Sequence, residues 1–283
     1  MDLVELQIFK TVAEQGGITR AATALHRVQS NVTTRVKQLE ERLGAKLFHR
    51  QGRKLVLSSE GRLLLTYADR LLRLSTEAQA AMKGHAPHGL FRLGSLESTA
   101  AARLPPVLAA YHRAHPEVRL ELVTGTSGAL VDRVLRGDIE AAFVAEPFPA
   151  KNLETLHAFT EELVLITPKS HGRVGTPKDI EQRVVLAFST GCSYRRRLES
   201  WLGRSSVVAE RVMEYGSYHA ITACVAAGGG IAVVPRSVLR VVGVENEVAV
   251  NTLPAHIGKA RTMLVWPRGH QSAALSALRD ELG

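Results

Sequence analysis

The sequence contains only two cysteines, Cys192 and Cys224, and aromatic side chains make up 5% of its 283 residues. So few cysteines exclude a disulfide framework, and both are expected to be free thiols in a reducing compartment. No apolar run reaches the roughly 18 residues that a transmembrane helix needs. The N-terminal segment is acidic and lacks an apolar core, so no secretory signal is predicted. We therefore expect a cytoplasmic protein with no membrane partner.

Positive charge is concentrated near the N-terminus. The chain has 36 Lys and Arg and 27 Asp and Glu, a net charge of +9. Residues 1–88 carry 14 of the basic and 8 of the acidic residues, a net charge of +6 in less than a third of the chain. A basic end on a nearly balanced body indicates a polyanionic partner, although a solvated basic surface would have the same composition.

Three short helices are predicted before residue 45. Apolar residues at helical spacing predict the first over residues 2–14. Thr19 is a favourable N-cap for an alanine-rich second helix over residues 20–26. A third helix is expected to run from Gln29 to Gly44, where glycine ends it. Its apolar face would consist of Val32, Val36, Leu39 and Leu43.

The opposite face of this third helix is polar and basic, which suits a major groove. Apolar segments on both sides of Gln51-Gly52-Arg53 predict a hairpin with a basic tip, which would contact the DNA backbone or minor groove. A helix-turn-helix followed by such a wing is more specific for DNA than either part, each of which alone is also found on ordinary surfaces. The candidate DNA-binding residues are Gln29, Ser30, Asn31, Thr33, Thr34, Lys37, Arg50 and Arg53.

Residues 16–61 resemble the DNA-binding signature of LysR-type transcriptional regulators. The matching positions are Ala21-Ala22, Leu25-His26, Gln29, Val32, Leu39-Glu40, Leu43-Gly44, Leu47-Phe48, Arg50, and Ser58 with Gly61. The resemblance implies a winged helix-turn-helix over residues 1–58 that binds an interrupted inverted repeat in double-stranded DNA. Where the family often has Ser-Gln-Pro-Ala, this sequence has Val28-Gln29-Ser30-Asn31, so the base preference stays open.

Residues 59–88 are predicted to form a long helix and a linker. An apolar seam at coiled-coil spacing consists of Leu64, Tyr67, Leu71, Leu74 and Ala78. A helix buried against its own domain would show a similar pattern. LysR-type regulators use this helix to join two subunits, so the resemblance implies a homodimer that assembles further into a tetramer. RNA polymerase is a further candidate partner.

From residue 89 onward, short apolar strands alternate with helices, which is typical of an α/β domain. Strands are expected at 90–95, 118–124, 139–144, 163–167, 184–188, 207–213, 231–234 and 262–265, and a last helix at 271–282. The resemblance implies an effector-binding domain of two lobes, similar to periplasmic binding proteins. The first lobe would cover 90–160 and 266–283, and the second 161–265. The whole chain would then combine an all-α winged helix-turn-helix, a linker helix and this α/β domain.

Several strand ends carry hydroxyls before a helix, where an anionic group is favoured, although helix capping alone would explain each of them. Glu97 and Glu146 also follow strands. In a partly dehydrated cleft they need an internal partner such as Arg103, Arg195 or His219, or else a cationic ligand. Three segments of the domain resemble regulators of putrescine utilisation, which favours an amine or amino acid-like effector. The candidate effector-binding residues are Glu97, Ser98, Thr99, Thr126, Ser127, Glu146, Cys192, Ser193, Ser217, Tyr218 and His219.

Enzymatic and redox functions have weaker support. Gly228-Gly229-Gly230 lies between a helix and a strand, the reverse of the order in a dinucleotide-binding turn. His112 and His115 lack a recognisable third ligand, so no metal, no cofactor and no catalytic residue is expected. The alternative function is thiol-based redox sensing by Cys192, whose pKa the neighbouring residues 195–197, all arginine, would lower.

Overall fold

The computed structural model describes residues 1–52, 54–83, 87–181 and 183–282. The candidate DNA-binding residue Arg53 therefore lies outside the described residues. The chain divides into two compact units, Met1–His85 and Ala86–Gly283, and we describe each by itself. In the described part of the chain, no helix is both long enough and apolar enough to cross a membrane.

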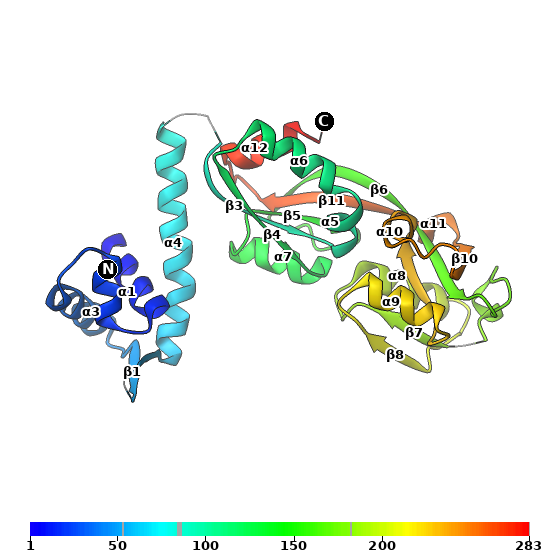
Figure 1. Cartoon of the computed structure of the whole chain (residues 1–283), viewed down its shortest axis with the longest axis horizontal. Coiled ribbons are helices and arrows are strands. Elements are labelled where there is room, and N and C mark those ends of the chain that lie inside the picture. Colours follow the sequence, from blue (N-terminus) through cyan, green and yellow to red (C-terminus); the bar gives the residue numbers. More distant parts are fainter. Residues whose placement is uncertain (53, 84–86, 182, 283) are drawn as a thin grey trace. The chain divides into compact units, whose positions relative to one another are not determined.

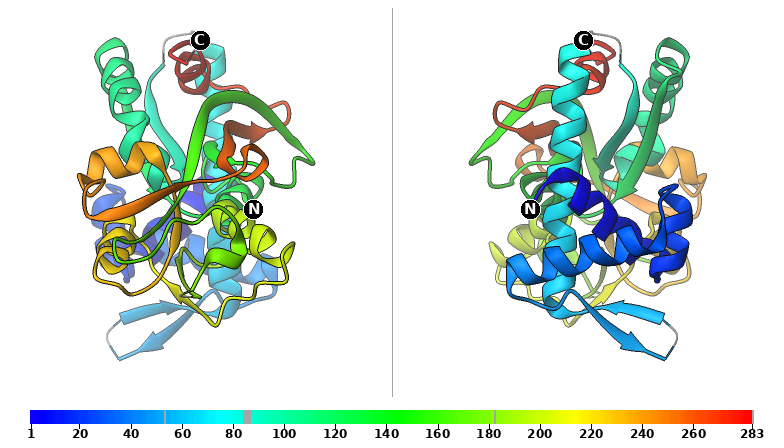
Figure 2. Two further views of the ribbon diagram at one scale, coloured as in Figure 1. Left: turned by 90° about the vertical axis from the view of Figure 1, so that its right-hand side faces the viewer. Right: turned by 90° about the vertical axis from the view of Figure 1, so that its left-hand side faces the viewer.

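The first unit consists of helices and one hairpin (Figure 1). Its elements are α1 (Leu3–Gln15), α2 (Ile18–Ala24), α3 (Gln29–Leu43), β1 (Phe48–Gln51), β2 (Lys54–Leu57) and α4 (Ser59–Lys83). Phe9 of α1, Leu39 of α3 and Leu47 before β1 are buried together in one core. Figure 2 shows the β1–β2 hairpin projecting from the helices, as expected for a wing.

Local sequence explains most helix ends in this unit. Asp2 and Glu5 form a capping box at the start of α1, and Gly44 ends α3 in the left-handed conformation. The prediction that Thr19 caps α2 is wrong. The helix begins at Ile18 after Gly17, and the Thr19 carbonyl accepts the hydroxyl of Thr23 within the helix. The chain can turn this early because Gly16 adopts a left-handed φ of 62°.

The second unit is built on a seven-stranded sheet. The first lobe contains β3 (Gly89–Ser95), β4 (Val118–Thr124) and β5 (Ala141–Ala145), which pair in parallel in the order β5–β3–β4. Two antiparallel strands, β6 (Leu153–Pro168) and β11 (Lys259–Pro267), continue the sheet beyond β5. Helices α5 (Glu97–Ala102), α6 (Leu104–Ala114), α7 (Ser127–Arg136) and α12 (Ala273–Asp280) complete this lobe.

Alternation along the strands buries both faces of the first lobe's sheet. On β5, Phe143 faces the core formed with α6 and α12, whereas Val144 faces the core that includes Leu130 of α7. On β11, Trp266 and Val265 divide between the same two cores. Helices therefore cover both faces, which leaves the ends of the strands as the place for a site.

The second lobe uses the far half of β6, which Figure 1 shows running on from the first lobe. Leu163–Pro168 of β6 pairs with β9 (Ala232–Pro235) and β10 (Val248–Thr252). A bridge between Val185 and Ile231 adds β7 (Val184–Ala187), which pairs with β8 (Arg211–Glu214). The helices are α8 (Ser193–Gly203), α9 (Tyr218–Ala226), α10 (Arg236–Val242) and α11 (Ala255–Gly258), with a short 3-10 turn, η1 (Pro177–Asp179).

The second unit differs from the sequence-based expectation in several places. The strand predicted over 163–167 is only the end of β6, which begins at Leu153 because its first half pairs with β11. The strand predicted over 207–213 begins only at Arg211, because the preceding residues follow the turn that ends α8. The return to the first lobe, predicted at 266, comes earlier, because Thr262 of β11 already pairs with Ala145 of β5. The strand β10 and the helices α10 and α11 were not predicted.

Candidate functional site

The exposed face of α3 carries a row of polar side chains. Gln29, Ser30, Asn31, Thr34 and Lys37 are all exposed, and Thr33 is half-buried. The hydroxyl of Thr33 donates to the carbonyl of Gln29 at 2.9 Å, so this side chain presents its methyl group and its lone pairs rather than its hydrogen. The row therefore offers mixed donors, acceptors and one cation on a helix whose opposite face is buried.

The hairpin is attached to α3 by the buried side chain of Glu40. Its carboxylate accepts hydrogen bonds from the backbone N–H groups of Leu47 at 2.8 Å and Phe48 at 3.4 Å, and from Lys46 Nζ at 3.0 Å. Burial alone would raise the Glu40 pKa, but these hydrogen bonds outweigh it and hold the pKa below its usual range. Glu40 thus fixes the wing, including the exposed Arg50, relative to α3.

A second contact places α4 against the same hairpin. The Ser58 hydroxyl accepts the N–H of Gly61 at 2.8 Å and donates to the carbonyl of Lys46 at 2.6 Å. A Cβ atom at position 61 would collide with the carbonyl oxygen of Leu47, so glycine is required there. The match of Ser58 and Gly61 to the signature therefore has a packing reason.

Helix α4 has an apolar stripe that its own unit leaves uncovered. Leu63 and Leu74 are each 61% exposed, and Tyr67 and Leu71 lie between them on the same side. By contrast, Leu64 is half-buried and packs against the core of its own unit. The exposed stripe therefore runs through Leu63 rather than through Leu64 of the predicted seam, and the exposed Ala78 continues it.

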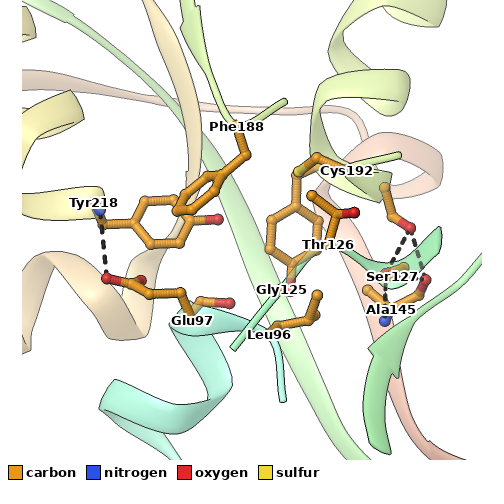
Figure 3. Close-up of a pocket in the computed structure, with 12 residues that line it drawn as sticks. Leu96, Glu97, Gly125, Thr126, Ser127, Ala145, Phe188, Cys192 and Tyr218 are labelled. Carbon is orange, nitrogen blue, oxygen red and sulfur yellow. Dashed lines mark hydrogen bonds between the residues drawn. The ribbon is translucent and has the colours of Figure 1, made fainter. Parts of the chain in front are cut away.

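The second unit encloses a pocket between its lobes, with about 280 Å³ of empty space that includes part of the open mouth. Figure 3 shows Glu97 and Tyr218 towards one end and Ser127 and Ala145 towards the other. The lining residues come from both lobes: Leu96, Glu97, Ser98, Gly125, Thr126, Ser127, Ala145, Phe188, Cys192, Ser193, Tyr194 and Tyr218. The rings of Phe188 and Tyr218 pack at 4.8 Å between centroids.

Serine hydroxyls join the two lobes at one end of this pocket. Ser193 Oγ on α8 donates to the Ala145 carbonyl at 2.8 Å and lies 3.0 Å from Ser127 Oγ on α7. Ser127 Oγ also accepts the N–H of Ala145 at 3.1 Å. These two hydroxyls are buried and engaged with each other, so they are not free to accept a ligand's carboxylate in this conformation.

Glu97 is the only charged side chain among the described residues that line the pocket. Burial raises its pKa, and a long 3.5 Å hydrogen bond from the N–H of Tyr218 and the proximity of His219 offset this only in part. Its second oxygen, Oε2, is buried and has no hydrogen-bond partner in the described structure. A half-buried carboxylate in this state favours a hydrogen-bond donor or a cation beside it.

Three buried hydroxyls near the pocket also have few partners. Ser98 Oγ, Tyr194 OH and Thr262 Oγ1 come from α5, α8 and β11, and among the described atoms their only hydrogen bonds are weak ones from Ser98 and Thr262 to the Tyr194 hydroxyl. Ser98 and Thr262 lie close enough to the Tyr194 hydroxyl to influence its pKa, which burial raises strongly. We call these three side chains the hydroxyl cluster. Each hydroxyl keeps capacity for a further hydrogen bond, so the cluster can accommodate a polar group of a ligand at this point.

Comparison with known proteins identifies the family. Residues 3–62 match the family described as "Bacterial regulatory helix-turn-helix protein, lysR family", and residues 84–283 match the "LysR substrate binding domain". The chain belongs to the LysR family of transcriptional regulators. It is therefore a DNA-binding regulator with an effector-binding domain, as the signature implied, and the family is not enzymatic.

Relatives and solved structures agree with this assignment. YusT of Bacillus subtilis, an uncharacterized HTH-type transcriptional regulator, is 39% identical over 285 residues, covering 99% of this chain and 95% of the relative. GltR of Bacillus subtilis is 37% identical, covering 94% and 90%. Full-length CbnR complexed with its target DNA has the same fold, with a TM-score of 0.70 at 22% identity and coverage of 100% and 99%. A full-length OxyR variant from Pseudomonas aeruginosa has a TM-score of 0.71 at 20% identity, covering 100% and 94%.

In this LysR-type chain, the pocket contains seven of the predicted effector-binding residues: Glu97, Ser98, Thr126, Ser127, Cys192, Ser193 and Tyr218. Four predicted residues lie outside its lining. Thr99 is buried, and Ser217 caps α9 by accepting the N–H of His219, whose side chain is exposed.

Glu146, the fourth, is held at the edge of the lobes. Its carboxylate lies 3.6 Å from Arg261 Nη1, and its carbonyl accepts Arg197 Nη2 at 3.2 Å. Of the three internal partners that the sequence suggested, His219 lies near Glu97 and lowers its pKa, whereas the two arginines are engaged elsewhere. Arg103 binds Glu161, and Arg195 is paired with other carboxylates of the second lobe.

Sequence reasoning missed two aromatic lining residues, Phe188 and Tyr194. Phe188 directly follows β7 and Tyr194 lies in the first turn of α8, so each stands at a strand end or a helix start, where the sequence predicts lining hydroxyls. The expectation for the Cys192 thiol is wrong. Burial dominates and raises its pKa, while the neighbouring N–H groups and arginines lower it only in part.

Proposed function

We propose that this LysR-type regulator binds, as a dimer, an interrupted inverted repeat and reads bases with the exposed face of α3. The exposed Gln29, Ser30 and Thr34 and the half-buried Thr33 supply groups that hydrogen-bond base edges. Lys37 and Arg50 are exposed cations on α3 and on the wing, and they would contact phosphates. The rigid link through Glu40 supports both roles, because it fixes the wing at one position relative to α3.

Two substitutions separate base reading from phosphate binding. In the full-length protein, Gln29→Ala should relax the sequence preference by about 1–3 kcal/mol per contact. Arg50→Ala should weaken binding to all sequences alike. It should also reduce the slope of the logarithm of affinity against the logarithm of salt concentration by about one. Both are measured by titrating selected and scrambled DNA over a range of salt concentrations. The assignment fails if Arg50→Ala changes the preference while Gln29→Ala leaves it intact.

The effector that we propose carries an amino group, which binds at Glu97. The observation that supports this is the half-buried carboxylate with one unpartnered oxygen and no cation in the described lining. An anionic ligand would meet this carboxylate directly, and the described residues of the lining include no positive side chain to balance it. The resemblance of three segments to regulators of putrescine utilisation favours the same chemistry.

The hydroxyl cluster supports a second polar group on the effector. Ser98, Tyr194 and Thr262 can each donate and accept, so they suit a second amine, a hydroxyl or a carboxylate equally well. Phe188 and Tyr218 would pack on the carbon chain between the two polar ends. A short diamine or an amino acid-like molecule has this arrangement.

Calorimetry on the full-length protein tests the proposal with putrescine, 4-aminobutyrate and succinate. We expect the two amines to bind, succinate not to bind, and Glu97→Gln to weaken amine binding at least tenfold. Glu146→Gln is the matched control, because this carboxylate lies outside the pocket. Binding of succinate alone, unchanged in Glu97→Gln, would show that the effector is an anion.

A further inference from the structure

Val28, the residue before α3, is an unusually exposed valine. Its side chain is 69% exposed, although it adjoins a helix whose next apolar residue, Val32, is fully buried. It serves as the N-cap of α3 in an extended conformation, with φ −77° and ψ 144°, and no side chain caps the helix there. Val28 therefore contributes little to the core of its unit.

Valine is also a poor choice for this position on stability grounds. A serine, asparagine or aspartate at an N-cap would accept a helix N–H and stabilise α3 relative to an apolar residue. Because its isopropyl group is exposed, Val28 also gains little stability from the burial of apolar surface. Neither helix capping nor packing therefore explains why a valine stands here.

The backbone places Val28 beside the polar row of α3. The turn between α2 and α3 is tight, since His26 adopts a left-handed φ of 51° and the N–H of Arg27 donates to Ala22 O at 2.9 Å. Val28 then directly precedes the exposed Gln29 and Ser30. The N-terminal residues of a recognition helix are those that reach base edges in a major groove.

We propose that the Val28 side chain contacts the 5-methyl group of a thymine and thereby selects thymine at one position of each half-site. The thymine methyl is the only apolar group that a base pair presents in the major groove, and an exposed isopropyl group is complementary to it. This inference rests on the proposed role of α3 in base reading. It adds a shape-based contact to the hydrogen bonds of the neighbouring polar residues.

Uracil substitution tests the contact, because deoxyuridine differs from thymidine only in lacking the 5-methyl group. The full-length protein is first used to select a tight site from randomised DNA. Each thymine of that site is then replaced singly by deoxyuridine, and affinities are measured at one fixed salt concentration. We expect one thymine per half-site whose replacement weakens wild-type binding about fourfold, the value for one buried methyl group. Val28→Ala should bind the thymine and uracil forms equally at that position.

Two controls separate the contact from effects on folding. Val28→Ser introduces a favourable N-cap, so it should be at least as stable as the wild type and still lose the discrimination. Val208→Ala removes an equally exposed valine of the second unit, 73% exposed, and should keep the wild-type response at every thymine.

The proposal is overturned if no thymine shows the effect, or if Val28→Ala retains it. It is likewise overturned if Val28→Ala changes self-association in sedimentation while the uracil scan stays unchanged, because the valine would then contact protein. Failure of base reading by α3 itself is distinguishable. In that case Gln29→Ala would also leave the selected sequence unchanged.

Discussion

The carboxylate of Glu40 on α3 accepts the backbone N–H of Leu47 at 2.8 Å, so the recognition helix and the wing are joined through one buried side chain. The arrangement of the two elements that we propose contact DNA is thus set within the first unit. It does not depend on the hairpin's own two-strand pairing, which is marginal in isolation.

Replacing Glu40 by alanine should weaken both the fold and DNA binding. The N–H groups of Leu47 and Phe48 would be buried without an acceptor, which costs about 1–3 kcal/mol. Urea unfolding measures this loss of stability. DNA titration should show a lower affinity, because the wing that carries Arg50 is no longer held in place. Glu41→Ala is the control, since the neighbouring side chain is exposed. Equal stability of the two variants would contradict the proposed linkage.

An ion pair formed by the buried carboxylate of Glu161 should stabilise the connection between the lobes. Glu161 on β6 accepts Arg103 Nε at 2.7 Å and Nη2 at 3.1 Å, and Ser237 of α10 adds a third hydrogen bond at 2.8 Å. Arg103→Met would leave a buried carboxylate without its cation and should cost about 3 kcal/mol, the low end for such pairs because solvent reaches Arg103.

A double-mutant cycle checks that this loss comes from the unpaired charge. Adding Glu161→Gln to Arg103→Met should restore most of the stability, because the remaining amide is neutral. Denaturant unfolding of the four proteins gives the coupling free energy. If the two losses simply add, the pair does not stabilise the fold in this way.

The exposed stripe of α4 should join two subunits. Leu74→Asp places a charge on a side chain that is 61% exposed in one chain, so the monomer should fold normally while the dimer dissociates. Sedimentation of the full-length protein measures the dimer, and DNA titration should show a large loss of affinity for a two-half-site operator. Thr76→Asp, on the opposite side of the same helix, is the matched control. A Leu74→Asp protein that stays dimeric would rule out this interface.

Much of the fold follows from local sequence, whereas the site depends on contacts between distant segments. Gly44 marks the end of α3, and the alternation of β4 predicts its bounds of Val118–Thr124. The pairing of Ser127 with Ser193 joins residues of two lobes, so no local pattern reveals that these hydroxyls are already engaged. In α4, Leu63 and Leu64 are equally apolar. Only the packing of the hairpin and α1 decides that Leu64 faces the core.

Cys192 should react slowly with oxidants and alkylating reagents. The thiol is buried and its pKa is raised, mainly by that burial, so little reactive thiolate is present at neutral pH. Thiol titration with and without denaturant should show protection in the folded protein, and peroxide should leave DNA binding unchanged. Cys192→Ser should keep the same DNA binding. Rapid oxidation of Cys192 with a change in DNA affinity would support redox sensing instead.

Glu97 should make both stability and effector binding depend on pH, in opposite directions. Burial raises its pKa in the folded chain, so the folded state holds the proton more tightly than the unfolded state does. The stability that this protonation contributes is complete below the ordinary glutamate pKa of 4.5 and is lost as pH rises through the raised value. Glu97→Gln, which stays neutral, should therefore gain stability relative to the wild type as pH rises through that range.

An amine binds the ionised carboxylate, so putrescine affinity should increase over the same range, by up to tenfold per pH unit below the raised pKa. Urea unfolding and calorimetry at matched pH values measure the two trends, with Glu146→Gln as the control that should keep the wild-type behaviour. Parallel pH profiles for wild type and Glu97→Gln would show that Glu97 is not the titrating group.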